Sequence, residues 1–284
     1  MLALTLAFGA SVAWGSADFL AGASCRRVAL LAVLFVSQAV GLALVLPVAS
    51  TLGGAVPAPS YLLLGLLAGA FNALALAALY RALAVGNMSI VAPIAACDAV
   101  IPLAFGVLTG DRLSGLEATG IALAVAGVVL AARPRSSEAD GVGEPGRSNA
   151  EGIALALVAA ICFGGFVVAL DSASDGGFLW AVTLSRLSSV GLIAMAVLTL
   201  RPSLDIGRGD AAPLLAVGAL DLGASALFAV ATTTGLLSVV GVLGSLYPVI
   251  TVILAGVVLH ERAGGIQRLG TVGALAGAAL IAAG

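Results

Sequence analysis

The chain has no lysine and a single histidine, His260, among its 284 residues. Without lysine it contains no GxxxxGK[ST] phosphate-binding loop, which excludes ATP-driven transport by this chain alone. One histidine cannot supply a set of imidazole ligands for a metal or haem site. The three cysteines, Cys25, Cys97 and Cys162, show no paired spacing, so a disulfide is not expected; within apolar segments a free thiol behaves as a small hydrophobic group. We therefore expect no cofactor and no metal.

Charged side chains are also scarce. They make up 9% of the chain, whereas 61% of the residues are apolar and the mean hydropathy is +1.20. A soluble domain carries about 25% charged residues, so this is not a soluble protein, and its arginines form no basic patch for nucleic acid. Apolar runs of about 20 residues match the hydrocarbon thickness that a helix must cross. We therefore expect a multi-pass protein in the lipid bilayer of a cell membrane, the cytoplasmic membrane of a bacterium.

Apolar runs separated by charged or Pro/Gly-rich breaks predict an all-helical protein with ten transmembrane helices. We expect these helices over Leu2–Gly22, Val28–Ser50, Ser60–Tyr80, Met88–Thr109, Leu113–Ala132, Gly152–Leu170, Phe178–Leu200, Ala211–Val230, Leu236–Leu259 and Ile266–Ala283. The stretch 133–151 is polar and poor in large apolar residues, which is typical of a flexible linker. It divides the chain into two five-helix units, residues 1–132 and 152–284.

The two units repeat each other with an offset near 149 residues. The segment "GDRLSGLEATG", which starts at Gly110, matches "HERAGGIQRLG", which starts at His260. Other matched positions are Trp14–Gly15 with Phe163–Gly164, Ser37–Gln38 with Ser185–Arg186, Asn72 with Asp221, and Ser89 with Ser238. Because five is an odd number, the second unit enters the membrane upside down, as in transporters built from inverted repeats. Two such units have two packings of similar energy, one open to each side, as alternating access requires.

The second unit carries a pattern that belongs to a known family. In "GLLSVVGVLGSLYPVITVILAGVVLHERAGGIQRLGTVGALAGAALIAAG", Pro248 lies in the fourth helix, Glu261–Arg262 follow about 13 residues later, and the last helix has spaced glycines. With these features the chain resembles the EamA-type transporters of the drug/metabolite transporter superfamily over its whole length. The first unit departs from the pattern, because Asp111 replaces the usual glutamate and Asp98 stands where the spacing would place the proline. The resemblance implies a small-molecule carrier, often an exporter of amino acids, metabolites or drugs.

Polar residues inside the predicted helices are candidates for a substrate-binding site. A charge near the centre of a membrane helix costs about 2.5–3.5 kcal/mol on insertion scales, so each needs a partner, a water-filled cavity or an interface. Asp221 lies deepest among the carboxylates, and Asn72 holds the equivalent place in the first unit. Arg186 could hold a substrate carboxylate with two hydrogen bonds. The alternative is an internal ion pair between Arg186 and Asp221 that fixes packing.

Asp98 lies between Pro93 and Pro102 in the fourth predicted helix. Prolines free backbone carbonyls, which membrane helices tolerate where these line a cavity, so Asp98 is a second candidate for binding substrate or a proton. Trp14 and Tyr247 could line the same cavity, although aromatic residues in membrane helices more often face lipid or the interface.

Three other groups of charged residues are expected to be structural. For Asp18, close to the end of its helix, we expect an interfacial position. Asp111–Arg112 and Glu261–Arg262 are expected to cap and anchor helix ends.

The leading hypothesis is a secondary transporter that exports small metabolites, amino acids or drugs by alternating access around a midplane cavity. A passive pore and a non-transporting membrane scaffold are the alternatives. Enzyme activity is not expected, because the scattered Asp residues and the one histidine form no cluster of nucleophile, base or metal ligands. The expected partner is a small-molecule substrate. Proton coupling through Asp221 or Asp98, substrate exchange, facilitated diffusion and the oligomeric state are left open.

The arginines predict the orientation of the chain in the membrane. Loops after the odd-numbered predicted helices hold ten arginines, and loops on the other side hold only Arg112. The positive-inside rule then places the odd-numbered loops in the cytoplasm and both termini outside. The family resemblance implies the opposite orientation, with both termini in the cytoplasm.

Overall fold

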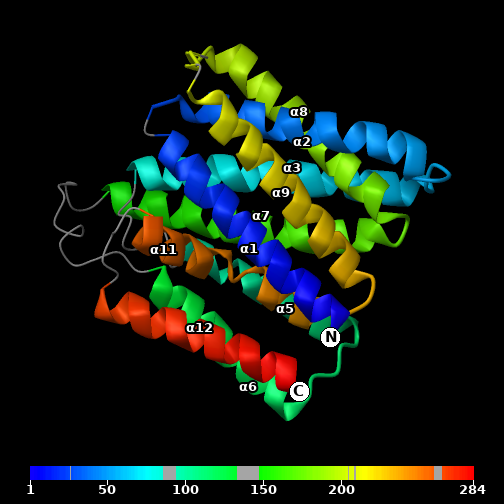
Figure 1. Ribbon diagram of the computed structural model, residues 1–284, viewed down its shortest axis with the longest axis vertical. Helices are drawn as coiled ribbons and strands as arrows, with labels where there is room; N and C mark the ends of the chain where they lie inside the picture. The colour runs from blue at the N-terminus through cyan, green and yellow to red at the C-terminus, as the bar shows by residue number, and fades with distance from the viewer. Residues whose placement is uncertain (26, 86–93, 133–146, 204, 208, 259–263) are drawn as a thin grey trace.

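The structure is a computed structural model that describes residues 1–25, 27–85, 94–132, 147–203, 205–207, 209–258 and 264–284. Within these ranges every regular element is a helix (Figure 1). The elements are α1 (Leu2–Ser24), α2 (Leu30–Leu52), α3 (Pro59–Val85), the 3-10 helix η1 (Ala96–Ala99), α5 (Val100–Thr109), α6 (Gly115–Ala131), α7 (Arg147–Ser174), α8 (Phe178–Leu200), α9 (Ala211–Thr232), α10 (Leu237–Gly244), α11 (Tyr247–Val258) and α12 (Gly265–Ala283). The predicted all-helical class is confirmed for this part of the chain.

Most of these helices are built to cross a bilayer. Eight helical segments in the described residues are long and apolar enough to span it, and two shorter apolar segments, Ala96–Thr109 and Gly115–Ala131, accompany them. A helix satisfies its backbone hydrogen bonds internally, which is the condition for stability in hydrocarbon. The chain is therefore a multi-pass membrane protein, and the count of ten crossings stays a prediction.

The predicted helix bounds are close to the observed ones, with a few differences. Phe178–Leu200 is as predicted, whereas α7 begins at Arg147, inside the predicted linker, and continues to Ser174. Glu151, in its second turn, pairs with Arg81 near the end of α3, with 3.3 Å between Oε1 and Nη2, and this pair joins the two helix ends. Residues 133–146 of the predicted linker and 86–93 of the fourth predicted helix lie outside the described residues.

The single helix predicted over Leu236–Leu259 is instead two helices, α10 and α11, that meet at Ser245 and Leu246. Pro248 has no N–H group and cannot donate to the carbonyl of Gly244 four residues earlier, so the regular ladder ends there. In the first unit the helix is continuous from η1 into α5 but is wound as a 3-10 helix over Ala96–Ala99, where Pro102 cannot donate to the carbonyl of Asp98. Each unit thus has an irregular backbone at the depth of its fourth predicted helix.

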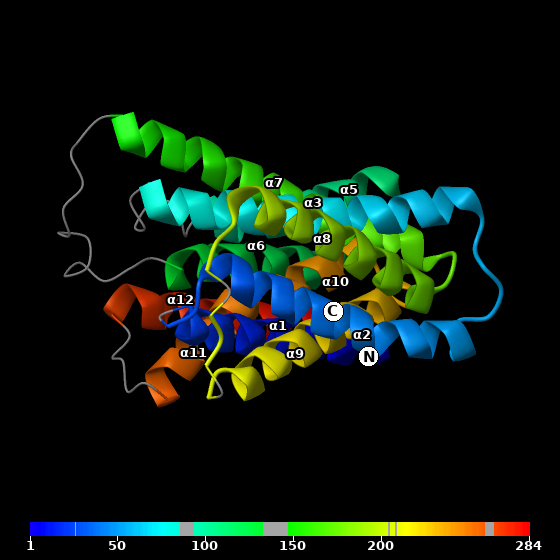
Figure 2. The same cartoon turned by 90° about the horizontal axis from the view of Figure 1, so that it is seen from above.

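Helices of the two units pack against each other across the whole molecule. Helix α1 packs against α9, α3 packs against α7, and α2 packs against α8. Figure 2 shows α3 and α7 side by side from above. The units therefore interlock instead of forming two separate bundles.

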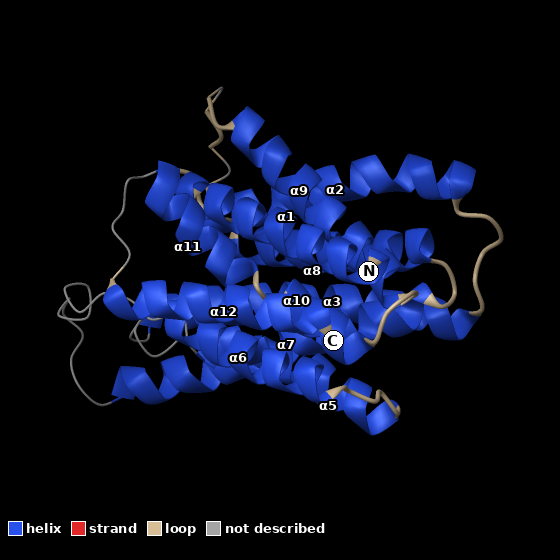
Figure 3. Cartoon of the chain, turned by 60° about the horizontal axis from the view of Figure 1, so that its bottom comes forward, coloured by secondary structure: helices blue, strands red, loops and turns tan. Residues whose placement is uncertain are grey.

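Helices α6 and α12 form a pair at one side of the bundle, visible at the bottom of Figure 1 and again in Figure 3. Their backbones touch because glycines face each other. A Cβ atom at Gly127 would lie 2.3 Å from the backbone nitrogen of Ala274, and one at Gly277 would lie 2.5 Å from that of Ala124. Small residues allow such close approach between membrane helices.

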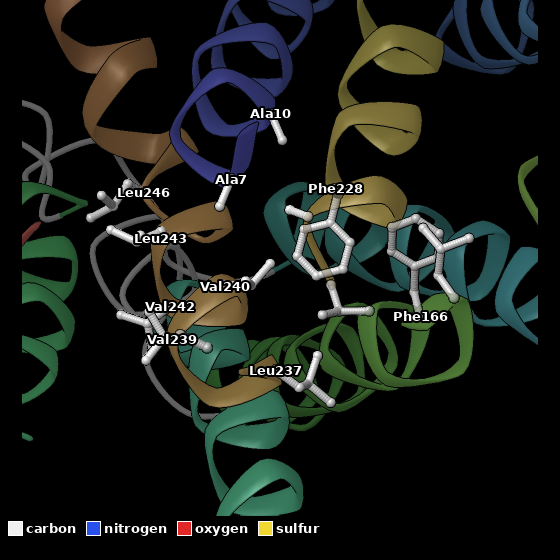
Figure 4. Packing of buried hydrophobic residues seen from close by; sticks show 14 of the residues in the cluster. Ala7, Ala10, Phe166, Phe228, Leu237, Val239, Val240, Val242, Leu243 and Leu246 are labelled. Atoms are coloured by element: carbon white, nitrogen blue, oxygen red, sulfur yellow. The ribbon is translucent and has the colours of Figure 1, made fainter. Parts of the chain in front are cut away.

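A buried apolar cluster fills the space between α1, α7, α9 and α10 (Figure 4). Its central side chains come from Ala7 and Ala10 of α1, Phe166 of α7, Phe228 of α9 and Val240 of α10. Ala7, Ala10, Phe228 and Val240 have no exposed surface. Apolar side chains therefore fill the interior of the bundle beside the first half of α1.

Candidate functional site

Asp221 is the centre of a polar network that joins four helices, α1, α2, α8 and α9. The indole Nε1 of Trp14 donates to its Oδ1 at 3.1 Å. The amide Nε2 of Gln38 donates to its Oδ2 at 2.8 Å, and Arg186 Nη1 forms an ion pair with the same oxygen. Both carboxylate oxygens are thus satisfied by side chains from other helices.

Arg186 is 2% exposed and is the largest fully buried side chain described. Its Nη1 also donates to Gln38 Oε1 at 2.6 Å, and its Nη2 donates to the Asp221 carbonyl at 2.9 Å and to Ser225 Oγ at 2.5 Å. Only Nε lacks a partner. A guanidinium offers five donors in a rigid fork; three contacts hold this one against α9, and the fourth joins it to Gln38 of α2.

Local sequence explains why the network forms here. Asp221 and Ser225 are four residues apart and lie on one face of α9, and the Ser225 hydroxyl donates back to the Asp221 carbonyl at 3.0 Å. Gly218, one turn before Asp221, allows α2 to approach α9, because a Cβ atom there would lie 2.5 Å from the carbonyl oxygen of Ser37. This close contact places Gln38 within reach of Asp221.

Asp98 and Tyr247 form a second polar pair. Asp98, in η1, is 4% exposed, and the hydroxyl of Tyr247, the first residue of α11, donates to its Oδ2 at 3.4 Å. The other oxygen, Oδ1, has no hydrogen-bond partner. Asp98 lies in the 3-10 helix η1 and Tyr247 begins α11 after the break from α10, so the two irregular segments face each other.

The aromatic ring of Trp14 is directed into the bundle. It lies 6.2 Å from the ring of Phe166 at an interplanar angle of 68°, and 5.6 Å from the ring of Phe228 at 41°. Trp14 is therefore packed between α7 and α9 and is not a lipid-facing residue. Its position links the apolar cluster of Figure 4 to the carboxylate of Asp221.

Asp18 belongs to the same region, in contrast to the interfacial position expected from the sequence. It lies four residues after Trp14 on the same face of α1. Its side chain is exposed, yet it is surrounded by protein, and the charges of Asp98 and Asp221 lie close enough to act on it. Asp18 therefore belongs electrostatically with Asp98 and Asp221. The four-residue spacing from Trp14 was the sequence signal that could have revealed it.

The six candidate residues do not all meet in one network. Trp14, Arg186 and Asp221 are joined, and Asp98 and Tyr247 form the second pair. Asn72 of α3 is 7% exposed, and among the described residues its side chain makes no hydrogen bond to either group. Gln38 and Ser225 also belong to the Arg186–Asp221 network. Their residue types did not single them out in the sequence, because neutral polar residues are common in membrane helices.

The architecture matches known proteins. The EamA-like transporter family matches the chain in two segments, residues 1–133 and 150–283. The chain belongs to the EamA-like transporter family. A solved structure described as "Crystal structure of protein" aligns with 98% of this chain and 95% of its own length, at a TM-score of 0.80 and 19% identity; at that identity the likeness shows the fold alone. A comparison with curated proteins gave no match. Members of the family are membrane transporters, not enzymes.

In this EamA-like transporter, a second group of carboxylates lies at one end of the bundle, which we call the acidic end: Asp111, Asp171 and Asp175. The charges of Asp111 and Asp175 act on Asp171, near the end of α7. Asp111 Oδ2 accepts from the Ser238 backbone nitrogen at 3.0 Å and from Ser238 Oγ at 2.7 Å. Asp111 therefore caps α10 of the other unit, where a local cap was expected.

The opposite end carries the exposed arginines of the described helix ends, and we call it the arginine-rich end: Arg27, Arg81, Arg201 and Arg268. Arg112 is the exception, at the acidic end, where both chain termini also lie (Figure 1). His260 and Glu261–Arg262 lie outside the described residues.

Proposed function

We propose that this chain is a secondary transporter that exports small molecules across the bacterial cytoplasmic membrane by alternating access. The main support for this proposal is the Arg186–Asp221 network, because it lies inside the bundle and joins α1 and α2 of one unit to α8 and α9 of the other. A charged network costs stability when it is buried without full compensation. Placed between two units, it can exchange partners when those units move.

The relation between the units supports two inverted repeats, residues 1–132 and 152–284. Gln38 and Arg186 are 148 residues apart, and Asp98 and Tyr247 are 149 residues apart, close to the repeat offset. Each pair is in contact. A residue that touches its own counterpart, as Gln38 touches Arg186, lies next to the axis that relates the repeats. Asp98 touches Tyr247, which directly precedes Pro248, the residue at its own place in the second unit. Both polar groups therefore lie close to this axis. Substrate sites in inverted-repeat transporters lie at the repeat interface near the bilayer midplane.

A carrier in one of its two states is closed on one side of its binding site and open on the other. The two sides of the network differ in this way. The apolar cluster around Phe228 and Val240 closes the interior toward the acidic end. Asp18, on the part of α1 nearer the arginine-rich end, is accessible. The geometry thus supports a state that is open toward the arginine-rich end.

The substrate-binding residues in this proposal are Trp14, Asn72, Asp98, Arg186, Asp221 and Tyr247. Arg186 and Asp221 neutralise each other at rest, Trp14 supplies a flat apolar surface, and Asp98 supplies a carboxylate oxygen that is not yet bonded. Asn72 would enter the site only after α3 moves relative to α8, against which it packs.

The test is a comparison of metabolites inside and outside cells that express the wild type, Asp221→Asn, Asp205→Asn or no transporter. Asp205 lies exposed in the α8–α9 connection, so its variant controls for the same chemical change away from the site. We expect one class of solute to be redistributed by the wild type and Asp205→Asn but not by Asp221→Asn. Equal redistribution by all three proteins would make Asp221 structural.

Purified protein in liposomes separates a carrier from a pore. A carrier's flux of the identified solute saturates and shows counterflow when the solute is supplied on the opposite side. A linear flux without counterflow would indicate a passive pore. No redistribution in cells and no flux in liposomes would indicate a non-transporting scaffold.

A further inference from the structure

The charges within the described membrane helices do not balance. Away from the helix ends they comprise three carboxylates, Asp18, Asp98 and Asp221, and one guanidinium, that of Arg186. Arg186 forms its ion pair with Asp221. Among the described residues Asp18 and Asp98 therefore remain without a cation, and the charges of Asp221 and Asp98 both act on Asp18.

Of the two, Asp98 has the greater need of a positively charged partner, because it is 4% exposed and its Oδ1 accepts no hydrogen bond. The hydrogen bond from Tyr247 to its Oδ2 is long at 3.4 Å, and Ser245 and the backbone of Ala99 also act on the carboxylate. A buried carboxylate is costly without a paired cation and further hydrogen bonds. Within the described residues no other basic side chain is buried, and the chain has no lysine that could serve. A positively charged ligand would supply the missing partner.

An anionic ligand fits the site poorly. Both terminal nitrogens of Arg186 already donate to Asp221, Gln38 and Ser225, which leaves only its Nε as a donor. A negative ligand would also be repelled by Asp18 and Asp98. The site thus lacks the bidentate arginine fork that usually recognises carboxylates and phosphates.

The surroundings fit an organic cation better than a small inorganic ion. The ring of Trp14 is partly accessible and is packed against Phe228, and its N–H is held by Asp221. Aromatic faces attract cations placed within about 6 Å, tryptophan most strongly. Asp98 and Trp14 both pack against α7, at Gly164 and Phe166 respectively. A carboxylate and an aromatic ring held by the same helix are suited to an amine or a quaternary ammonium group that carries an apolar body.

Carboxylates also lie toward both ends of the bundle. With the repeat offset of 149 residues, Asp18 of α1 corresponds to position 167 of α7. That position is one helical turn before Asp171. Asp18 lies toward the arginine-rich end, and Asp171, with Asp111 and Asp175, lies at the acidic end. Acidic groups along a path raise the local concentration of cations and repel anions.

We infer that the transported molecule is an organic cation, an amine or quaternary ammonium compound with an apolar or aromatic body, bound between Asp98 and the ring of Trp14. This inference rests on the proposed transport function and names its substrate class. Asp18 guides the cation into the site from the accessible side. The Arg186–Asp221 pair holds Trp14 in place and leaves Asp98 as the group that meets the positive charge.

The test uses Trp14 as a reporter. The chain has two tryptophans, so Trp180→Phe, placed in lipid nanodiscs, leaves Trp14 as the only one. Three probes share a phenyl ring and a tetrahedral head group but differ in charge: phenyltrimethylammonium, methyl phenyl sulfone and benzenesulfonate. We expect saturable change of Trp14 emission with the ammonium probe alone, and a loss of affinity of about tenfold or more in Asp98→Asn, as for a truncated buried charge pair.

Two further variants complete the design, each in the Trp180→Phe background and each checked for helicity and monodispersity. Asp18→Asn, at an accessible position, should weaken ammonium binding several-fold without a folding defect. Asp205→Asn should leave the affinity unchanged. Tighter binding of the sulfonate, equal affinity in Asp98→Asn and its parent, or no response of the folded protein to any probe would each overturn the inference.

Transport is judged separately, by the metabolite comparison and by counterflow. A transported anion or neutral solute, in a protein that does not bind the ammonium probe, would overturn the cation inference while the transport function stands. Saturable binding of the ammonium probe that depends on Asp98, in a protein that moves no solute, would overturn the transport function and leave a cation-binding site.

Discussion

The hydroxyl of Tyr247 donates to the carboxylate of Asp98 across the interface between the two units, and Tyr247 directly precedes Pro248, which holds the place of Asp98 in the second unit. Tyr247 begins α11 after the break from α10, and Asp98 lies in the 3-10 helix η1. Irregular backbone is tolerated at membrane depth only where protein or a water-filled cavity surrounds it. The contact thus joins the two irregular segments inside the protein.

One series of variants tests whether the Arg186–Asp221 pair has a structural role or a role in transport. Arg186→Gln leaves Asp221 without a cation, and removing one partner of a buried pair costs about 3–5 kcal/mol. We expect a large drop in the melting temperature of the purified protein. The double variant Arg186→Gln, Asp221→Asn removes both charges and should recover most of that stability.

The same double variant decides between the two roles of the pair. Recovery of stability without recovery of transport would show that the charges act in the transport cycle. Recovery of both would show that the pair serves packing alone.

Asp111 should control the order of α10. Asp111→Ala removes the acceptor for the backbone nitrogen and hydroxyl of Ser238, and loss of a helix cap costs about 0.5–2 kcal/mol. We expect faster amide hydrogen exchange over Leu237–Gly244. Glu117→Ala is the matched control, because Glu117 belongs to the capping box of α6 itself; it should speed exchange in α6 and leave α10 unchanged.

The glycine contact between α6 and α12 should tolerate no side chain. In Gly127→Ala the new methyl group would lie 2.3 Å from the backbone of Ala274, and forced overpacking typically costs about 1–3 kcal/mol. We expect a lower melting temperature. Gly191→Ala in α8 meets no atom within 4 Å and should raise stability slightly, because alanine favours a helix over glycine by about 1 kcal/mol. Equal effects of the two substitutions would contradict the assigned contact.

The arginine-rich end should face the cytoplasm, as the positive-inside rule predicts. In a variant without native cysteines, Ser203→Cys reports on this end and Val56→Cys reports on the acidic end; both positions are exposed or partly exposed in connections between helices. A membrane-impermeant maleimide added to intact cells should label position 56, and position 203 only after permeabilisation. The reverse pattern would establish the orientation implied by the family, and Asp18 would then face the outside.

Much of the helical organisation could be predicted because a membrane helix is a local structure. Its backbone bonds are internal and its apolar length must match the bilayer, so Phe178–Leu200 was predicted to the residue and α1, α9 and α12 to within two residues. The split between α10 and α11 was not predicted. Pro248 is visible in the sequence, but a proline in a membrane helix produces a kink or a break depending on the neighbours that satisfy the freed groups.

The site was predictable only in part. Charge at membrane depth and the repeat singled out Arg186 and Asp221, because an isolated buried charge is costly wherever it stands. The same reasoning could not find Gln38 or Ser225, whose neutral side chains carry no such cost. It also placed Asp18 at an interface, since sequence shows depth along a helix but not which face meets the other unit.

The sequence by itself determined that the chain is a helical, multi-pass membrane protein with a duplicated pattern, because hydrophobic length, scarcity of charge and internal repetition are properties of the chain alone. Only the tertiary structure decided which polar residues meet. Asp221 is satisfied by Trp14, Gln38 and Arg186, whereas Asp98 keeps an unbonded oxygen. Partners that lie 35 to 207 residues away in the chain are set by how the helices of the two units interlock. Among the described residues, that packing gives a cation to Asp221 but not to Asp18 or Asp98.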